Sequence, residues 1–454
     1  MYALASLVLL PVVLAAQVPQ FVPPSEGPLV ASSIYPGFNN GSLPKAEQVS
    51  GKAFQRIIHI WLENTDFLSA NSTAAFNTLA TQGIRLDQYC ALTHPSEPNY
   101  VASVGGDFFG MGDDNLYNIP ANISTVVDLL EAKNISWASY QENIPFDGYE
   151  GYNYTSKNYV NTSAPGYVYY VRKHNPTIIY DSVASVPSRL ARHRNFNDFA
   201  ADVNASALPQ WMFVTPNMVD DGHDTSVDYA ASWLQYWLFP LLNDTNFNDN
   251  GTLIVLTFDE NESYTENNCV LALLLGGAVP SRARGTTDST YYTHYSLLST
   301  VEANWGLGSL GRGDTNKTLS NVFSFVAAAT GYKNLNISSS EVLTNATGTI
   351  PGPLNPGLYV PFTAPNTSAV GAGGGSVFVA SGMNTSFTAA VAPSPVNLTQ
   401  QNKTVPWSGP RNGSNAVNST GSGSGKSGAV DMREGIVGAA IFGTILAGVV
   451  ALLV

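Results

Sequence analysis

Positive charge is scarce in this sequence. Its 454 residues include 20 Lys and Arg against 33 Asp and Glu, which gives a net charge of −13 at pH 7. Charged residues of both signs make up only 12% of the chain. A protein that binds nucleic acid needs a basic face for the phosphate backbone, so we expect no nucleic acid partner. The length is enough for one large domain or two ordinary ones with a substantial core.

Cysteine is also scarce, because the chain has only Cys90 and Cys269. An even number of cysteines in a secreted protein suggests a disulfide bridge, and two buried free thiols are the alternative. A bridge would tie the region just before Ser96 to the start of a later strand.

Both ends of the chain are apolar. Residues 1–16 end in Leu-Ala-Ala and are typical of a signal peptide, and they are too short to span a bilayer. Residues 436–454 form an uncharged tail after a polar spacer (426–434) and a run of small residues (421–425). That order is typical of a GPI-attachment signal; a single C-terminal transmembrane helix is the alternative, but it lacks a basic cytoplasmic flank. We therefore expect a secreted protein that is anchored to the plasma membrane or held in the cell wall.

Asn-x-Ser/Thr sequons are frequent, on the order of twenty, and they predict N-linked glycans in a secreted chain. Examples begin at Asn71, Asn122, Asn153, Asn204, Asn243, Asn316 and Asn345. Composition then divides the chain into a signal peptide (1–16), an extended leader (17–50), a candidate catalytic domain (51–362), a glycosylated stalk rich in Ser, Thr, Gly and Asn (363–425) and the GPI signal (426–454). The sequence carries no signal for an oligomeric state.

Apolar, β-branched runs alternate with amphipathic runs along the central domain. We predict strands at 55–62, 84–91, 136–141, 210–216, 252–258 and 269–275, and helices at 74–82, 100–104, 125–133, 197–203, 227–242 and 294–305. This alternation predicts an α/β fold with a mostly parallel central sheet and helices on both faces. Residues 147–194 are rich in Tyr and Asn with little periodicity, so we expect a long loop or cap over the site.

Polar side chains gather where the predicted strands end. Glu63 and Asn64 follow the first strand, and Asp259 and Glu260 follow the strand at 252–258. Ligands bind outside the carboxyl ends of the strands in sheets of this kind. Adjacent acids at the end of a buried strand repel one another unless a cation lies between them, so these oxygen ligands predict a divalent metal site. A set of helix caps and solvated loop acids is the alternative.

Ser96 lies on the predicted strand-to-helix turn, in the run His94-Pro95-Ser96-Glu97-Pro98-Asn99-Tyr100. A hydroxyl just outside a helix faces free backbone N–H groups and the positive end of the helix dipole. This position suits an oxygen that attacks an anion, and it equally suits a helix cap.

Three histidines are candidates for proton transfer. His223 lies in the run 220–224, His294 lies at the start of the helix predicted at 294–305, and His94 comes two residues before Ser96. Neighbouring groups could fix the tautomer of each ring or raise its pKa, although a single histidine is more often structural. Arg56, Arg172 and Arg192 could clamp a phosphate, and their spacing favours none of them.

Several motifs, in this chain order, resemble the phosphoesterase family. They are Glu63-Asn64, His94-Pro95-Ser96-x-Pro98-Asn99-Tyr100, Asp221-Gly222-His223-Asp224, Thr257-Phe258-Asp259-Glu260, Thr293-His294-Tyr295-Ser296 and Gly306-Leu307-Gly308 with Gly311-Arg312. The family groups secreted acid phosphatases with bacterial phospholipases C, within the alkaline phosphatase superfamily. The resemblance covers roughly residues 50 to 330. The phospholipase members carry Glu-Asn-Arg-Ser-Phe-Asp, whereas this chain has Glu63-Asn64-Thr65-Asp66-Phe67, which favours the fungal acid phosphatase branch.

The resemblance implies a role for each matched residue. Ser96 would be the nucleophile that is phosphorylated transiently, and His223, His294 and His94 would assist it, as imidazoles charged at acid pH. Asn99 and Asp221 would bind phosphate. The metal ligands would be Glu63, Asn64, Ser96, Asp259 and Glu260, and Asp221, His223 and His294 could form a second metal site.

We therefore expect a secreted acid phosphatase that hydrolyses phosphomonoesters with the help of a divalent metal ion. A phosphodiesterase or phospholipase C using the same site is one alternative. A non-catalytic cell-wall protein that retains the fold is another.

Overall fold

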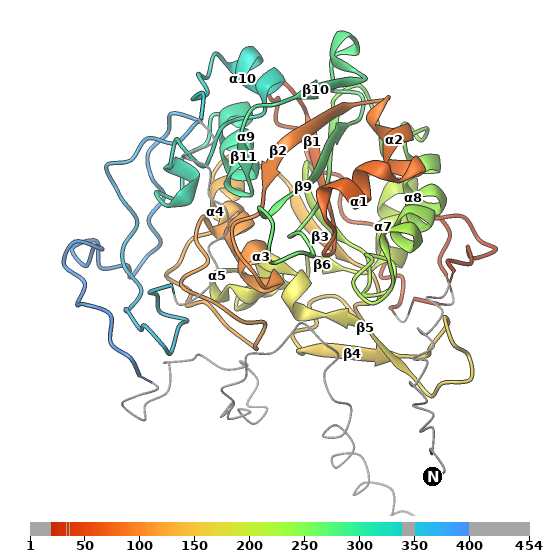
Figure 1. The fold of residues 1–454 in the computed structure, drawn as a ribbon, viewed down its shortest axis with the longest axis horizontal. Helices are drawn as coiled ribbons and strands as arrows, with labels where there is room; N and C mark the ends of the chain where they lie inside the picture. Colours follow the sequence, from red (N-terminus) through yellow and green to blue (C-terminus); the bar gives the residue numbers. More distant parts are fainter. Residues whose placement is uncertain (1–19, 33, 36, 338–349, 399–454) are drawn as a thin grey trace, which may run out of the picture. The chain divides into compact units, whose positions relative to one another are not determined.

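The computed structural model describes residues 20–32, 34–35, 37–337 and 350–398 (Figure 1). The predicted signal peptide, the GPI signal and residues 399–425 lie outside these ranges. Within them, no helix combines the length and the hydropathy that a bilayer crossing requires.

A nine-stranded sheet runs through the described residues, in the order β10-β2-β9-β8-β1-β7-β3-β6, and β11 also pairs with β2. Strand β9 is antiparallel to both of its neighbours, and the other pairs are parallel. The mostly parallel sheet predicted from the sequence is therefore confirmed. The strands are β1 (Arg56–Leu62), β2 (Ile84–Cys90), β3 (Trp137–Gln141), β6 (His193–Arg194), β7 (Trp211–Thr215), β8 (Thr252–Phe258), β9 (Cys269–Leu275), β10 (Thr286–Asp288) and β11 (Tyr292–Thr293).

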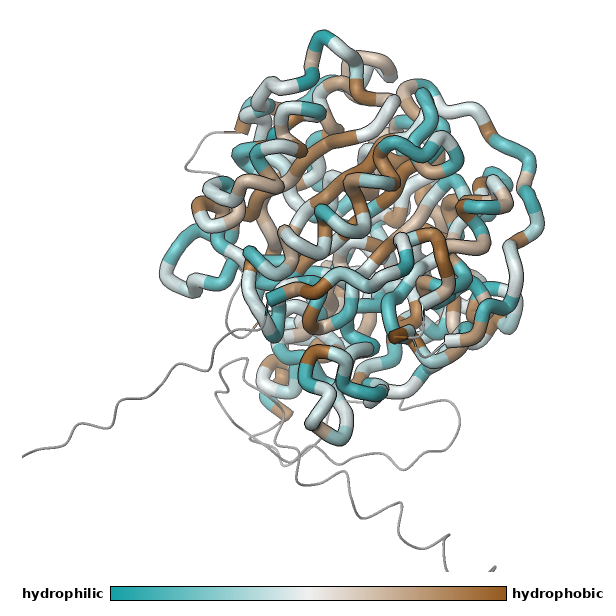
Figure 2. The backbone as a smooth tube through the Cα atoms, turned by 90° about the vertical axis from the view of Figure 1, so that its right-hand side faces the viewer, coloured by the Kyte–Doolittle hydropathy of each residue, from teal (hydrophilic) through white to brown (hydrophobic). Residues whose placement is uncertain are grey.

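Helices cover both faces of the sheet (Figure 1). Helices α1 (Phe67–Ser72), α2 (Ala74–Ala80), α7 (Phe196–Asn204) and α8 (Val227–Leu241) lie on one face. Helices α3 (Ser96–Gly105), α4 (Val126–Glu131) and α9 (Tyr295–Trp305) lie on the other, where α10 (Ser324–Thr330) packs against α9. The central strands are therefore buried on both sides, which explains why β8 and β1 are mostly apolar and do not alternate between apolar and polar residues. Figure 2 shows these hydrophobic strands inside a more hydrophilic exterior.

The segment at 147–194, which we expected to be a long loop, contains regular structure. Its elements are the antiparallel hairpin β4 (Asn153–Ser156) and β5 (Tyr167–Val171), the 3-10 helices η1 (Arg172–His174) and η2 (Pro176–Ile179), α5 (Asp181–Ala184), α6 (Pro187–Leu190) and β6. Tyr149, which precedes the hairpin, packs on Tyr154 of β4 and Tyr170 of β5.

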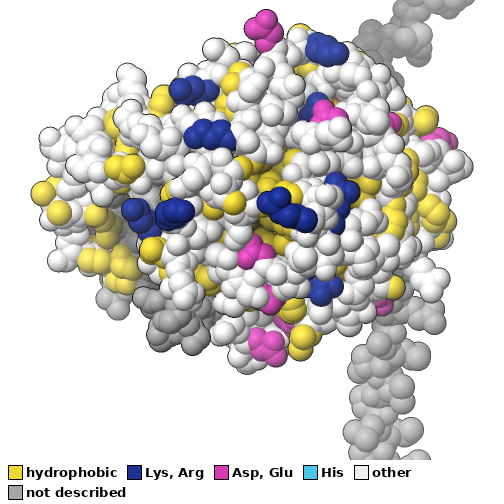
Figure 3. All heavy atoms as spheres, turned by 90° about the horizontal axis from the view of Figure 1, so that it is seen from above, with side chains coloured by type: hydrophobic (Ala, Val, Ile, Leu, Met, Phe, Trp, Pro, Cys, Tyr) yellow, Lys and Arg dark blue, Asp and Glu magenta, His cyan; other side chains and the backbone are white. Residues whose placement is uncertain are grey.

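The first part of the predicted stalk packs on the domain, which corrects the expectation of a free stalk for residues 363–398. The Gly375 N–H donates to Leu307 O at 3.1 Å, and the Phe378 N–H donates to Ser309 O at 2.8 Å. The Ala372 N–H donates to the buried carboxylate of Glu302 in α9 at 3.1 Å. The 3-10 helices η3 (Ser281–Ala283) and η4 (Gly313–Thr315) complete the described elements. On the face seen in Figure 3, Lys and Arg side chains are scattered among uncharged ones.

Candidate active site

The register of two neighbouring strands brings the predicted acidic pairs together. Strands β1 and β8 are parallel and aligned so that Leu62 pairs with Phe258, the last residue of each strand. Glu63 and Asp259 therefore leave the sheet side by side. The Asn64 N–H donates to Asp259 Oδ1 at 3.2 Å, and the Thr65 N–H donates to the Glu260 carbonyl oxygen at 3.3 Å.

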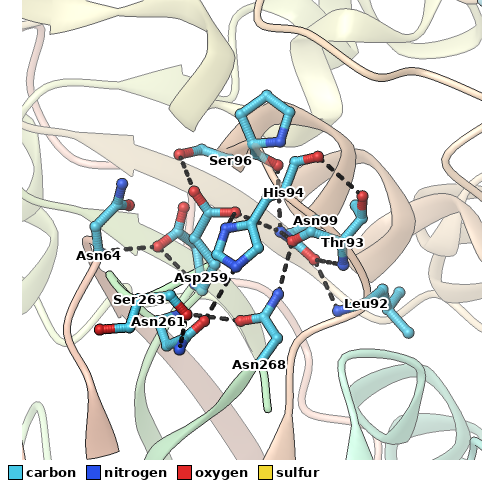
Figure 4. A network of polar contacts seen from close by, with 12 residues as sticks. Asn64, Leu92, Thr93, His94, Ser96, Asn99, Asp259, Asn261, Ser263 and Asn268 are labelled. Atoms are coloured by element: carbon cyan, nitrogen blue, oxygen red, sulfur yellow. Dashed lines mark hydrogen bonds and ion pairs between the residues drawn. The ribbon is translucent and has the colours of Figure 1, made fainter. Parts of the chain in front are cut away.

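The Ser96 side chain lies between two of these carboxylates. Its Oγ lies 3.3 Å from Glu63 Oε2 and 3.4 Å from Glu260 Oε1, so its single proton can be donated to either carboxylate. The residue is almost fully buried, and Figure 4 shows its position relative to His94 and Asp259. Ser96 is the first residue of α3, so this helix begins four residues before the predicted start at Tyr100. The cap position belongs to Pro95, and no side chain caps the helix. Ser96 is therefore not a helix cap, and its hydroxyl points to acids instead.

The oxygens around Ser96 fit a divalent cation. One terminal atom of the Asn64 side-chain amide, either oxygen or nitrogen, lies 2.9 Å from Glu63 Oε2 and 3.2 Å from Asp259 Oδ1. If this atom is nitrogen, the amide donates to both carboxylates. If it is oxygen, the oxygens of Asn64, Glu63 and Asp259 converge with no amide proton between them. A cation stabilises the second arrangement, and carboxylate, amide and hydroxyl oxygens are the ligands that Mg²⁺ and Ca²⁺ prefer.

Electrostatics supports the same interpretation. Burial raises the pKa of Glu63 and of Glu260 well above the usual range, and the neighbouring Asp259 raises both further. Burial also raises the pKa of Asp259, although contacts with Glu63 and Ser96 oppose the shift. A cation bound between these three buried carboxyl groups would stabilise their ionised forms.

His94 and Asn99 hold the loop that leads into α3. His94 Nδ1 lies 2.8 Å from Glu260 Oε2, and its Nε2 lies 3.0 Å from Asn261 Oδ1 (Figure 4). Asn99 accepts from the N–H groups of Leu92 and Thr93 and donates to the Thr93 carbonyl oxygen. Both side chains are thus engaged with protein groups. Phosphate binding by Asn99 and catalysis by His94 stay predictions.

His294 contacts the backbone of Asp259. Its Nε2 lies 2.6 Å from the Asp259 carbonyl oxygen, its Nδ1 lies 3.0 Å from the Tyr89 hydroxyl, and its ring packs on Trp61. Burial lowers the pKa of His294 to about 4, and burial does the same for His94. Burial thus favours the neutral ring in both residues, and the expectation that they are charged at acid pH stays a prediction. The catalytic role of His294 stays a prediction.

His174, in η1, is a site residue that the sequence analysis missed. Its Nε2 lies 3.2 Å from Glu63 Oε1, its Nδ1 lies 3.6 Å from Asp221 Oδ2, and its ring stacks on Tyr100. The Tyr100 hydroxyl also donates to Glu63 Oε1. The only signal was the basic run Arg172–His174 in a chain poor in such residues.

A possible second metal group therefore differs from the predicted one. One ligand atom each of Glu63, His174 and Asp221 lies within 4.8 Å of the others, and all three residues are buried. His223 lies beside this group, with its Nδ1 2.7 Å from Asp224 Oδ1 and its ring centre 6.2 Å from that of His174. The structure thus brings Asp221 together with His174, whereas His294 contacts Asp259 instead.

The three arginines named as possible phosphate clamps point elsewhere. Arg56 donates to the Pro209 carbonyl oxygen, Arg172 donates to the Tyr117 carbonyl oxygen and Asn118, and Arg192 lies over Trp137. The cation that does lie at the site is Lys173, whose Nζ is 2.8 Å from Asp114 Oδ2.

The two cysteines form the predicted disulfide. Cys90 ends β2 and Cys269 begins β9, and the two residues face each other in the antiparallel register. The bridge therefore fixes the strand end from which the loop to Ser96 departs.

Comparison with known proteins gives consistent results. The model of the Phosphoesterase family matches residues 39–308. The chain is 48% identical over 312 residues to an acid phosphatase of Aspergillus fumigatus, covering 68% of this chain and 67% of that protein. It is 46% identical over 326 residues to a probable acid phosphatase of Kluyveromyces lactis, covering 72% and 74%. These matches confirm the resemblance to the fungal acid phosphatase branch, and with it the expectation of an enzyme of that class.

A solved structure gives a more distant match. It belongs to a Vibrio parahaemolyticus protein of the alkaline phosphatase superfamily, at 10% identity and a TM-score of 0.37, and the match covers 61% of this chain and 72% of that one.

Proposed function

This chain belongs to the Phosphoesterase family, and we propose that it hydrolyses phosphomonoesters through Ser96 as the nucleophile. The observation that carries the proposal is the position of the Ser96 Oγ in the first turn of α3, within hydrogen-bond distance of carboxylate oxygens of both Glu63 and Glu260. A serine hydroxyl in this position has a base within reach and a helix N-terminus behind it.

The metal would be held by Glu63, Asn64, Asp259 and Glu260 with Ser96, the residues whose oxygens converge. When bound, a divalent ion lowers the pKa of a coordinated hydroxyl and neutralises charge on phosphoryl oxygens. His174 and Asp221 would orient Glu63 from the other side, through the 3.2 Å contact of His174 with Glu63.

In the first half-reaction, Ser96 Oγ forms a bond to phosphorus, and the bond from phosphorus to the alcohol oxygen breaks. Glu63 or Glu260 takes the serine proton. His223 gives a proton to the leaving alcohol, because its pairing with Asp224 through Nδ1 leaves Nε2 for the substrate. In the second half-reaction, water displaces Ser96 from phosphorus and His223 takes a proton from that water. The carboxyl group of Glu63 or Glu260 returns its proton to Ser96 Oγ, and inorganic phosphate leaves.

Mutation of Ser96 tests this proposal. We expect Ser96→Ala to reduce the rate with p-nitrophenyl phosphate at least about a thousandfold and to abolish a phosphoserine trapped by acid quench and identified by mass spectrometry. Ser103→Ala is the matched control, since Ser103 is a buried serine of the same helix whose Oγ donates to the Tyr100 carbonyl oxygen. Normal turnover in Ser96→Ala would exclude this nucleophile.

Substrate comparison separates the alternatives. We expect turnover of p-nitrophenyl phosphate to exceed that of bis-p-nitrophenyl phosphate and of phosphatidylcholine. A preference for the diesters would favour the phosphodiesterase or phospholipase C alternative. Failure of the metal-loaded protein to release phosphate from any ester would favour the non-catalytic cell-wall protein.

We also propose that the protein is secreted, N-glycosylated and GPI-anchored. Support comes from the apolar ends of the chain and from the sequons, of which those at Asn204, Asn243 and Asn316 are exposed. A mass decrease on treatment with an N-glycosidase, and release from membranes by a phosphatidylinositol-cleaving phospholipase C, are the expected results. Protein retained in the cytoplasm at the mass of the unmodified chain would exclude the proposal.

A further inference from the structure

A lysine and an aspartate from distant parts of the chain meet beside the first turn of α3. Lys173 Nζ lies 2.8 Å from Asp114 Oδ2. The other oxygen of the same carboxylate, Asp114 Oδ1, accepts from the Glu97 N–H at 2.9 Å. Glu97 follows Ser96, so one carboxylate joins the lysine to the residue next to the proposed nucleophile. We call these two residues the Lys173–Asp114 pair.

The backbone on both sides of Lys173 is fixed. Arg172 is buried and donates to the Tyr117 carbonyl oxygen and to Asn118, and His174 is buried against Glu63. The long Lys173 side chain, by contrast, is held at its end by Asp114, which is itself partly exposed. It has four rotatable carbons and a compact ammonium, which bonds in any direction.

The Lys173–Asp114 pair lies between the buried acids and the solvent. The Lys173 side chain is 11% exposed and that of Asp114 is 24% exposed, whereas Glu63 is fully buried. The hydroxyl of the exposed Tyr152 donates to the Asp114 carbonyl oxygen at 2.9 Å.

Lys173 is the cation whose charge reaches the site acids. It lowers the pKa of Glu63, Asp259 and Glu260, against the larger effect of burial. The Lys173 ammonium lies 2.8 Å from Asp114 Oδ2, and the same carboxylate accepts from the Glu97 N–H next to Ser96. A phosphoryl group entering this acidic site is attracted by a positive charge, and the ammonium of Lys173 supplies one.

We propose that Lys173 is a phosphate-binding residue and that Asp114 holds its ammonium until a phosphoryl group arrives. In the free enzyme the ammonium bonds to the Asp114 carboxylate, and with substrate it bonds to a non-bridging phosphoryl oxygen. Asp114 then keeps its bond from the Glu97 N–H. This inference rests on the proposed function, since it assigns a ligand to the same site.

The pair also favours phosphomonoesters over diesters. A monoester near neutral pH carries close to two negative charges, and a diester carries one. When the Lys173 ammonium leaves the Asp114 carboxylate for a phosphoryl group, its interaction energy is more favourable with a dianion than with a monoanion, because Coulomb attraction rises with charge. Loss of Lys173 should therefore cost more with monoesters than with diesters.

The test measures competitive inhibition by inorganic phosphate in the full-length, metal-loaded enzyme. We expect Lys173→Met to raise the inhibition constant about tenfold or more, and Lys173→Arg to restore part of the affinity. We expect Asp114→Asn to lower the constant, because the amide still accepts from Glu97 but no longer holds the ammonium. Lys133→Met, at an exposed position beyond α4, removes the same charge and should change nothing.

A merely structural ion pair predicts a different pattern. Both Lys173→Met and Asp114→Asn would then lower the melting temperature and leave the inhibition constant unchanged, or move it in the same direction. Either result overturns the proposal. If Lys173→Met fails to fold, the opposite shifts expected for Asp114→Asn and Lys173→Arg still decide the question.

Calorimetric binding of inorganic phosphate to Ser96→Ala separates the two hypotheses. If Ser96→Ala remains active and its tight binding of phosphate depends on Lys173, Ser96 is not the nucleophile but the phosphate site is supported. If activity requires Ser96 but phosphate binding does not depend on Lys173, Ser96 is supported as the nucleophile and the role proposed for Lys173 is wrong.

Discussion

His174 Nε2 lies 3.2 Å from Glu63 Oε1, across 111 positions of sequence. Glu63 turns its other oxygen to Ser96, at 3.3 Å. Burial lowers the pKa of His174 well below the usual range, and Lys173 and His223 lower it further. Burial therefore favours the neutral ring, in which one nitrogen carries a proton and the other a lone pair. His174 and the Tyr100 hydroxyl both lie at Oε1 of Glu63, and Oε2 faces the serine.

Removal of this imidazole should therefore impair the chemical step. We expect His174→Ala to lower kcat/KM with p-nitrophenyl phosphate at least about a hundredfold, because Glu63 loses its orienting partner. Steady-state kinetics with a melting curve measures the effect. The control is His193→Ala, since His193 is a buried histidine bonded to Thr177 and the Leu190 carbonyl oxygen, away from the site. Activity within a few-fold of wild type in His174→Ala would contradict this role.

Exhaustive chelation should inactivate the enzyme and destabilise it. Without a cation the buried Glu63, Asp259 and Glu260 repel one another, and a metal at about one hundred times its Kd contributes about 2.7 kcal/mol to the free energy of unfolding. Activity and melting temperature should fall together and recover together when a divalent ion is returned. An enzyme that keeps full activity after chelation, with no metal by elemental measurement, would rule out the metal site.

Glu302 should make the stability depend on pH. It is buried in α9, and burial raises its pKa well above the usual range, as does Asp314. The folded state therefore holds this proton more tightly than the unfolded chain does, so the stabilisation is complete below about pH 4.3 and is lost as the pH rises. Glu302→Gln keeps an acceptor for the Ala372 N–H without the charge.

We expect Glu302→Gln to melt at a higher temperature than wild type at about pH 7 and at the same temperature at about pH 4. Thermal melts across the pH range check this. The exposed Glu47→Gln is the control and should follow wild type throughout. A Glu302→Gln curve parallel to that of wild type would show that the carboxyl group is not the cause.

The disulfide should contribute strongly to stability. Cys90 and Cys269 are 179 positions apart, and the bridge closes a long loop in the unfolded chain. We expect the double variant Cys90→Ala, Cys269→Ala to lose roughly 2 to 5 kcal/mol of unfolding free energy, measured with urea. Thiol titration of the unreduced, denatured protein should find no free thiol; two titratable thiols would refute the bridge.

The sequence alone predicted the sheet and the acidic edge well. The apolar runs at 55–62 and 252–258 are long and lie in the centre of the sheet, so their pattern was not altered by solvent exposure. Glu63, Asn64, Asp259, Glu260 and Ser96 meet because each lies within two residues of a strand end or a helix start. Local position in an α/β chain was therefore sufficient to place these residues together.

The sequence could not predict His174, Lys173 or Asp114. These residues belong to segments without periodicity, and only the path of the hairpin β4–β5 brings 173 and 174 back to α3. The start of α3 was placed too late because Ser96 was expected on a turn just outside the helix, whereas it is the first helical residue. Pro98 is the third residue of the helix, where its missing N–H costs nothing.

The composition of residues 363–398 was misleading for a different physical reason. Gly and Ser suggested a flexible chain, but a Cβ added at Gly308 would lie 2.3 Å from the Ser376 carbonyl oxygen. Gly308 is thus needed for two backbones to approach closely, and the segment owes its order to bonds with residues 307–311.

The shared ending of β1 and β8 also limits how such a protein can change over time. Leu62 pairs with Phe258, and the next residue in each segment is an acid, Glu63 or Asp259. Exchange of one apolar side chain for another within either strand leaves that alignment intact. Insertion or deletion of a single residue between 57 and 62 would turn every following side chain to the opposite face and replace Glu63 with a neighbour. Natural variants should therefore differ in these strands by substitution and almost never in length.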